Sequence, residues 1–123
     1  MKILFVAPSN SIHSHKWINC FVNMKHQVAW ISLNAADAPK SADIFFTALE
    51  KPRYIFSWFY VFLRLAKIVR AFEPDVVHVH SAGSYGVLGL LTFFSPKIVT
   101  VWGSDVVINS KSFLKRSICK VIL

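Results

Sequence analysis

The side chains best suited to do chemistry stand at the end of one apolar run. Residues 75–80 read Asp-Val-Val-His-Val-His, which is typical of a buried strand, and a polar turn follows them. In an open parallel α/β sheet, ligands bind beyond the carboxyl ends of the strands. We therefore predict that the turn exposes His80 to a ligand, with Ser81 and Gly83 beside it. His78 falls in the strand interior, where a histidine is more often a core residue.

A second candidate group closes a later apolar run. That run ends at Trp102 and is followed by Gly103, Ser104 and Asp105, which places Asp105 at the same sheet edge as His80. A carboxylate there can accept hydrogen bonds from sugar hydroxyls or act as a base. We predict Asp105 and His80 as catalytic residues and the other three as substrate-binding residues. The alternative for Asp105 is the N-cap of a following turn.

The third candidate group follows the first apolar run. It has four polar residues close to an expected helix start: Asn10, His13, His15 and Lys16. This mix of donors suits a sugar or a phosphate group. The alternative is a solvated loop in which Ser14 caps a helix from residue 15 to about residue 25. Residues 7–12 contain no glycine, which excludes the glycine-rich phosphate loops of dinucleotide-binding and Walker-type proteins.

Two His-x-His pairs, His13/His15 and His78/His80, raise the question of a metal. Alternate residues of a strand share a face, so His78 and His80 could point to one ligand. A catalytic zinc site needs a third protein ligand. The chain has six acidic residues, of which Asp105 alone is well placed. We predict no metal site, and a metal-dependent hydrolase built on His78 and His80 is the weaker alternative.

The elements that must position these residues alternate along the chain. Strands are expected at residues 3–7, 27–33, 44–47, 75–80 and 97–102. Helices are expected at residues 15–25, 54–72 and 85–94, with a last one starting near Ser110 or Ser112. Such alternation predicts an α/β fold with a parallel sheet and right-handed crossovers. The length of 123 residues suits one domain.

The expected helix at residues 54–72 is both aromatic and basic. Its cations Arg64, Lys67 and Arg70 recur every three residues, and the whole chain carries a net charge of +8, which suits an anionic partner. One interpretation is a membrane interface near anionic lipid. The other, which we favour, is a surface helix that packs its aromatic side chains on the sheet. Because no reader motif accompanies the charge, we predict no nucleic-acid partner.

The sequence predicts a cytoplasmic protein. Five apolar residues separate Lys2 from Pro8, a run too short for a signal-peptide core. The clearest apolar stretches are about half of the roughly 20 residues that a membrane span requires. Cys20 and Cys119 form no Cys-x-x-Cys pattern, and we expect two buried free thiols in a reducing compartment.

Taken in order, several segments resemble one enzyme family, the GT-B glycosyltransferases of the family 4 type. The start of that family is similar to residues 2–6 (Lys-Ile-Leu-Phe-Val), 15–18 (His-Lys-Trp-Ile) and 26–28 (His-Gln-Val). Its next two signature segments are similar to residues 74–80 and 100–105. The sequence departs from the family at Lys25, where a glycine usually serves a tight helix-to-strand turn.

The resemblance implies a Rossmann-like domain, the N-terminal half of a GT-B fold, which mainly shapes the acceptor side. Such enzymes transfer a sugar from a nucleotide-sugar with retention at the anomeric carbon, without a required metal or further cofactor. The family's active-site histidine falls on His80, near the transferred sugar and the donor phosphate. Asp105 and residues 10–16 would line the acceptor pocket.

The resemblance also implies partners. Many members build polysaccharide or lipopolysaccharide at the cytoplasmic face of the membrane. We therefore expect a nucleotide-sugar donor, a glycan or lipid-linked acceptor, and peripheral contact with the inner face of the cell membrane through residues 54–72.

The end of the sequence predicts a partial protein. Residues 121–123 stop within an expected helix, without a glycine cap or a polar tail. We expect residues 1–123 to be a single, truncated acceptor-side domain that is inactive without the C-terminal donor-binding domain. The alternative is a non-catalytic, membrane-associated binding subunit that recruits a separate donor-binding chain.

Overall fold

A five-stranded parallel sheet with three helices makes up the part of the chain that the structure describes. The computed structural model describes residues 1–35, 37–39 and 41–103. The strands are β1 (Lys2–Val6), β2 (Gln27–Ser32), β3 (Ile44–Ala48), β4 (Val76–His80) and β5 (Lys97–Thr100). The helices are α1 (Ile12–Asn23), α2 (Ile55–Phe72) and α3 (Ser84–Leu91). The predicted Rossmann-like α/β fold is confirmed.

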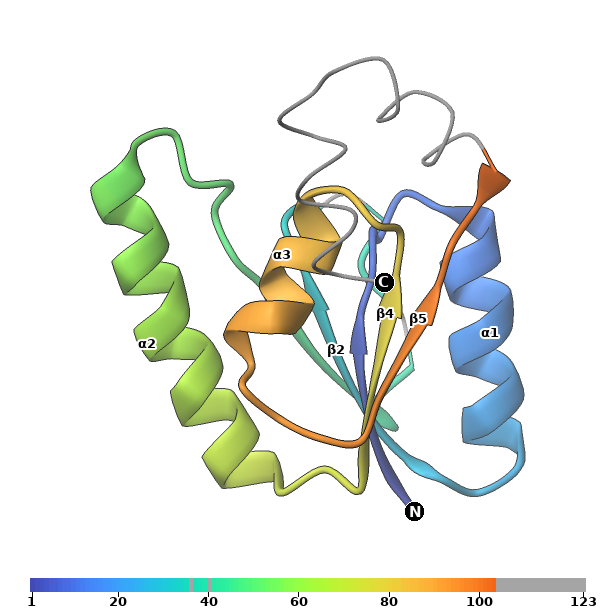
Figure 1. Cartoon of the computed structure of the whole chain (residues 1–123). Helices are drawn as coiled ribbons and strands as arrows, with labels where there is room; N and C mark the ends of the chain where they lie inside the picture. Colours follow the sequence, from blue (N-terminus) through green and yellow to red (C-terminus); the bar gives the residue numbers. More distant parts are fainter. Residues whose placement is uncertain (36, 40, 104–123) are drawn as a thin grey trace.

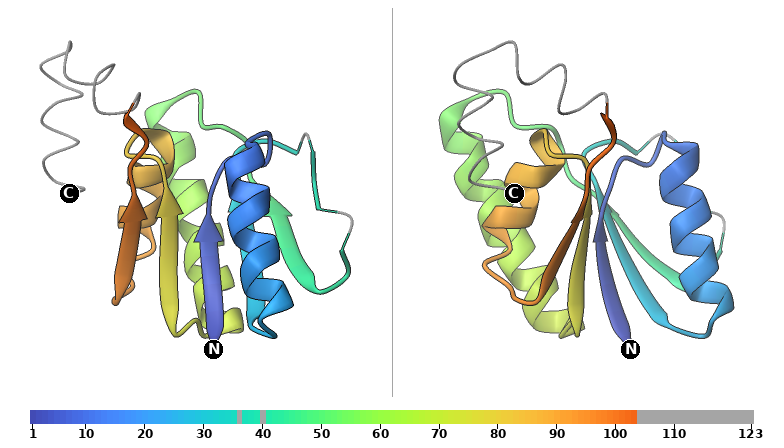
Figure 2. Two further views of the ribbon diagram at one scale, coloured as in Figure 1. Left: turned by 90° about the vertical axis from the view of Figure 1, so that its right-hand side faces the viewer. Right: turned by 45° about the vertical axis from the view of Figure 1, so that its right-hand side comes forward.

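The sheet has the strand order β3-β2-β1-β4-β5, and every neighbouring pair is parallel. Helices α2 and α3 cover one face of the sheet, and α1 covers the other (Figure 1). Figure 2 shows the strands side by side, all pointing to the same edge. The loops that follow β1, β4 and β5 therefore meet at that edge, which is the upper edge in Figure 1.

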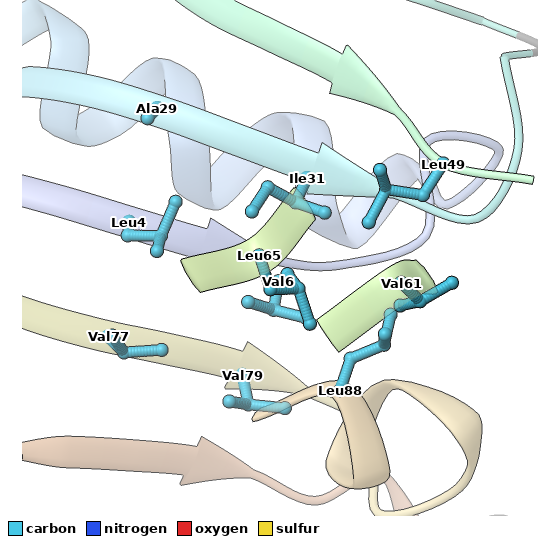
Figure 3. Packing of buried hydrophobic residues seen from close by; sticks show 10 residues of the cluster. All are labelled: Leu4, Val6, Ala29, Ile31, Leu49, Val61, Leu65, Val77, Val79 and Leu88. Carbon is cyan, nitrogen blue, oxygen red and sulfur yellow. The ribbon is translucent and has the colours of Figure 1, made fainter. Parts of the chain in front are cut away.

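Aliphatic side chains fill the face beneath α2 and α3. Alternate residues of each strand point to this side because a strand has a period of two. Val61 and Leu65 of α2 and Leu88 of α3 meet them, as Figure 3 shows. The members from β1, β2 and β4 are Leu4, Val6, Ala29, Ile31, Val77 and Val79. Burial of this apolar surface holds both helices on the sheet.

The opposite face, beneath α1, is aromatic. Ile18 of α1 packs there against Phe5 of β1 and Trp30 of β2, all of them fully buried. The indole Nε1 of Trp30 donates a hydrogen bond to the carbonyl oxygen of Ala7 at 2.9 Å. Such a bond is needed because a buried indole N–H without a partner costs free energy.

Helix α1 begins earlier than predicted. Its N-cap is Ser11, whose side chain makes no capping hydrogen bond. Ser14, predicted as the cap, lies buried in the first turn, and its hydroxyl oxygen is 3.4 Å from Nδ1 of His80. The prediction was wrong because the hydroxyl of Ser14 has a partner in the sheet and is not needed at the helix end.

Lys25 occupies a left-handed turn after α1. Its φ angle is 63°, and its N–H donates to the carbonyl oxygen of Val22 at 2.9 Å. The N–H of His26 donates to the carbonyl oxygen of Phe21 at 3.1 Å. These two bonds form a Schellman motif, in which glycine is the usual residue at the left-handed position.

Helix α3 is shorter than predicted and ends at Leu91 rather than at residue 94. The hydroxyl of Thr92 donates to the carbonyl oxygen of Gly89 at 2.7 Å, which satisfies one carbonyl of the last turn. Phe93 then takes a left-handed φ of 48°, so the helix cannot continue. Strand β5 likewise ends at Thr100, before the predicted Trp102.

Helix α2 has nearly the predicted bounds, but only some of its aromatic side chains, Trp58 and Phe72, pack on the sheet side as we favoured. Val61 and Leu65 are its buried residues, and Trp58 packs against their cluster. Phe56, with 87% of its surface exposed, lies on the outer side together with Phe59 and Tyr60. One face of a helix contacts the sheet, and consecutive aromatic residues cannot all lie on it.

Two remaining sequence predictions concern the thiols and membrane spans. Cys20 is exposed on α1, so the prediction that it is buried was wrong. Among the helices within the described ranges, none is long and apolar enough to cross a membrane. Ser104, Asp105, Cys119 and the predicted last helix lie outside the described residues.

Candidate active site

His80 closes β4 as predicted, but its side chain is not exposed. Its exposed fraction is 0%. The rings of Phe5, Trp17 and Trp102 surround it, with centroids 5.6, 6.2 and 6.0 Å from the imidazole. The prediction failed because the turn after β4 does not determine the exposure of His80; aromatic side chains from β1, α1 and the segment after β5 enclose it.

The two ring nitrogens of His80 differ in their partners. Nδ1 lies 3.4 Å from the hydroxyl oxygen of Ser14. Nε2 is buried and has no hydrogen-bond partner among the residues that the structure describes. Buried polar atoms in proteins are nearly always paired, so Nε2 of His80 is an exception at this sheet edge.

The imidazole of His80 is neutral at physiological pH. Burial, assisted by the neighbouring rings of His78 and His13, lowers its pKa to about 4. If the hydroxyl of Ser14 donates to Nδ1, the ring proton is on Nε2. Nε2 can then donate a hydrogen bond to a hydroxyl or phosphate oxygen, but the ring supplies no fixed positive charge.

His13 and Trp102 meet over this edge. Their rings stack with centroids 4.7 Å apart and planes at 29°. His13 is exposed on the first turn of α1, and Trp102 is half-buried after β5. The fold thus brings together three predicted site residues from three separate segments, because Trp102 contacts both His13 and His80.

His78 is buried two residues before His80, on the same side of β4. Its Nε2 is 2.7 Å from the hydroxyl oxygen of Thr100, and burial lowers its pKa. Its ring centroid lies 4.7 Å from that of His80. The predicted burial of His78 is confirmed.

In the parts of the chain that the structure describes, no three His, Cys, Asp or Glu residues are grouped in a way that could hold a metal ion.

Asn10 and His15 lie at a different part of the edge. They line a hollow of about 630 Å³ together with Asn19 and Asp37. Nε2 of His15 donates to the carbonyl oxygen of Ser9 at 2.7 Å, which orients the ring. Asn19 and Asp37 escaped the sequence analysis, because nothing in the sequence shows that the loop after β2 folds against α1.

The turn after β4 is held by Ser81. Its φ angle is 84°, and its N–H donates to the carbonyl oxygen of Thr100 at 2.9 Å. Its hydroxyl accepts a hydrogen bond from the N–H of Gly83, which is the N-cap of α3. Gly103 and Lys16 are exposed. Substrate binding stays a prediction for four of these residues: Lys16, Ser81, Gly83 and Gly103.

Comparison with known protein families gives one match that covers nearly the whole chain. Residues 2–123 match the family described as glycosyl transferase 4-like. The chain belongs to this family. The resemblance read from the sequence segments is therefore confirmed, and membership indicates a role in glycosyl transfer. A search of curated proteins found no match.

Two residues of the candidate site escaped the sequence analysis as site residues: Ser14 and Trp17. Both contact His80, Ser14 through its hydroxyl and Trp17 through its ring. A signal was present in the sequence, because Ser14, Trp17, Ile18 and Phe21 have the i, i+3, i+4, i+7 spacing of one helix face. Extending the helix by one turn would have placed Ser14 on the inner face.

Proposed function

We propose that this chain is the acceptor-side domain of a retaining glycosyltransferase. It would act with a donor-binding half, in the same polypeptide or in a partner chain, to move a sugar from a nucleotide-sugar to a glycan or lipid-linked acceptor. We place this reaction in cell-surface polysaccharide synthesis at the cytoplasmic face of the membrane. The observation that carries the proposal is the buried, neutral His80, whose Nε2 has no partner within the described residues, at the carboxyl edge of the sheet.

His80 is proposed to contact the donor during transfer. The bond between the anomeric carbon and the diphosphate oxygen breaks, and the acceptor oxygen bonds to that carbon. The acceptor proton leaves with the nucleotide diphosphate. A neutral imidazole with its proton on Nε2 can donate to a sugar hydroxyl or to the phosphate oxygen on which charge develops. Ser14 fixes the ring orientation through Nδ1.

The acceptor is proposed to occupy the hollow beside α1. Asn10, Asn19 and Asp37 give it amide and carboxylate groups that can pair with sugar hydroxyls. Trp102, stacked on His13, gives a flat apolar surface suited to a sugar ring. Gly103, Ser104 and Asp105 follow directly, and we propose that they complete the pocket. No metal or further cofactor enters the proposed reaction.

A second candidate function is a non-catalytic, membrane-associated subunit that recruits a donor-binding chain. The exposed aromatic side chains on α2 favour it, because such a surface suits attachment to a membrane or a partner. The two candidates differ in one respect. A recruiting subunit needs no chemistry at His80, whereas the transferase does.

The test is a transfer assay on the chain together with its donor-binding half. Radiolabelled UDP-sugars and GDP-sugars are supplied one at a time, with a membrane lipid extract as acceptor. We expect one donor to label a lipid or glycan product, whose anomeric configuration by NMR equals that of the donor. Asn10→Ala should raise the KM for acceptor, and Asn23→Ala, at the far end of α1, should not.

Two results contradict the proposal. Transfer with inverted configuration would exclude the retaining reaction. No label from any donor, with the donor-binding half present and folded, would favour the recruiting subunit.

A further inference from the structure

The outer side of α2 carries an exposed aromatic patch that the active site does not use. We define the aromatic patch as Tyr54, Ile55, Phe56, Phe59, Tyr60 and Leu63, whose exposed fractions run from 50% to 87%. Together they form two to three turns of apolar surface at the start of one helix. Contiguous exposed apolar surface of this kind marks an interaction site.

A neighbouring loop enlarges the patch. Phe93, after α3, is also exposed, and its ring meets that of Phe62 on α2 with centroids 5.7 Å apart. Phe62 in turn lies 6.5 Å from Phe59 of the patch. The apolar surface therefore extends from α2 to the end of α3, on the side of the sheet away from α1.

Cations border the patch. Residues 51–72 contain five cations, Lys51, Arg53, Arg64, Lys67 and Arg70, and no acidic residue. Three of them, Lys51, Arg53 and Arg64, line a hollow of about 1130 Å³ between the segment before α2 and the helix itself, with Glu50 as the one acid. The guanidinium of Arg64 also lies over the ring of Tyr60, 5.9 Å from its centroid. A phosphate group would find a positive site directly beside aromatic rings.

We propose that the aromatic patch docks on an anionic lipid bilayer, with the hollow of Lys51, Arg53 and Arg64 receiving a lipid phosphate. Apolar side chains enter the interface while basic side chains pair with headgroups, as in helices that lie in the membrane plane. Helix α2 stays attached to the sheet through Val61 and Leu65. It therefore lies on the bilayer and does not cross it.

The direction of α2 gives this docking a consequence for the site. The helix begins at the edge where the strands end, as Figure 1 shows, so the aromatic patch lies at the same end of the domain as His80. Docking would bring the site edge close to the membrane surface. This consequence rests on the proposed function, and it explains access to a lipid-linked acceptor.

Charge favours lipid over a second copy of the chain. A symmetric dimer through this face would bring the five cations of one copy against those of the other, because the same patch meets itself. Like charges placed together at an interface oppose association. Anionic headgroups complement the same cations.

The test is co-sedimentation of the full 123-residue chain with vesicles. We expect binding to phosphatidylcholine vesicles that contain phosphatidylglycerol, weak binding to pure phosphatidylcholine, and a loss of binding with added salt. Phe56→Ser and Phe59→Ser should each lower the partition coefficient about tenfold. Arg53→Gln and Arg64→Gln should each lower it about fivefold.

Matched controls lie elsewhere on the surface. Phe45→Ser changes an exposed phenylalanine on β3, and Lys25→Gln changes a cation beyond α1; both should leave binding unchanged. Absence of binding to the anionic vesicles would overturn the proposal, as would equal losses in Phe45→Ser and Phe56→Ser. Self-association that Phe56→Ser abolishes, without vesicle binding, would assign the patch to a second copy instead. The co-sedimentation assay contains no sugar donor. A failure to bind vesicles would therefore not count against the proposed glycosyl transfer, which the transfer assay tests.

Discussion

The two faces of the sheet bury different chemistry. Beneath α2 and α3 the strands present aliphatic side chains such as Val77 and Val79. Beneath α1, strand β4, which also contains Val77 and Val79, presents His78 and His80 next to Phe5 of β1. The period of two in β4 produces this division, since alternate residues reach opposite faces.

The difference between the two faces indicates that the aliphatic face contributes stability, whereas the α1 face holds the polar groups of the candidate site. The ten fully buried residues described in the aliphatic cluster have side chains without polar atoms, so none of these side chains needs a hydrogen-bond partner. On the α1 face, Nε2 of His78 bonds to the hydroxyl of Thr100, and the indole N–H of Trp30 donates to the carbonyl oxygen of Ala7. Nε2 of His80 is the exception among the described residues, and we propose that a substrate supplies its missing partner at the sheet edge.

The largest expected effect concerns the aliphatic face. Leu65 is fully buried between α2 and the sheet, so Leu65→Ala should lower the free energy of unfolding by about 2–5 kcal/mol through lost burial and a cavity. Urea unfolding measures this, with an unchanged m-value. Leu63→Ala, a half-exposed neighbour, is the control and should change stability by no more than about 0.5 kcal/mol. Equal losses in the two variants would contradict the packing described.

The next effect concerns acid and the α1 face. In the unfolded chain His80 has its ordinary pKa of 6.5, whereas in the folded chain its pKa is about 4. Between these values the unfolded chain binds a proton that the folded chain does not, so stability falls as the pH drops from about 6.5 to about 4, by about 3 kcal/mol. His78, whose pKa is also lowered by burial, adds to this loss.

Urea unfolding at a series of pH values measures this acid loss. His80→Gln should remove most of it, because glutamine does not titrate. His26→Gln, a change at the turn after α1, should keep it. A stability that is flat from pH 7 to pH 4.5 in the unsubstituted chain would show that His80 is not buried as a neutral ring.

A smaller effect tests how closely α3 approaches β4. A Cβ atom added at Gly89 would lie 2.5 Å from a methyl carbon of Val79, so Gly89→Ala should destabilise by about 1–3 kcal/mol through overpacking. Gly103→Ala is the control, since no described atom beyond its chain neighbours lies within 4 Å of its added Cβ. Thermal unfolding of both variants makes the comparison. A gain in stability for Gly89→Ala would mean that helix propensity outweighs the contact.

The smallest effect lies in the turn after α1. Lys25 has a left-handed φ of 63°, so Lys25→Gly should stabilise the chain by about 0.5–1 kcal/mol, the relieved strain exceeding the entropy cost of glycine. Lys25→Ala keeps the strain and should bring no gain. Denaturant midpoints measure both, and equal values for the two variants would contradict the strain.

The sequence was sufficient to predict the sheet and most of the helices. Continuous apolar runs identified the strands, because this signal is local. The ends of α1 and α3 were missed. The position of Ser14 depends on a partner in β4, and the end of α3 depends on a side-chain bond of Thr92. Both contacts exist only once the chain has folded.

Exposure was the property that the sequence predicted least well. His80 was expected to be exposed and is buried, while Phe56 and Phe59 were expected to pack and are exposed. The apolar run correctly predicted that His80 ends a strand. Its enclosure by Trp17 and Trp102 depends on residues far apart in sequence. The hollow that contains Asp37 is of the same non-local kind.

The central claim is that His80 serves transfer and His78 serves the core, although both lie on one face of β4. The direct measurement is the transfer rate of His80→Gln and His78→Gln in the chain together with its donor-binding half, each variant first shown to be folded by circular dichroism. We expect His80→Gln to lower kcat by about 10²–10³, the loss typical of removing one donor to a developing charge. His78→Gln should keep most of the activity. Equal rates for the two variants, or unchanged turnover in His80→Gln, would contradict the claim.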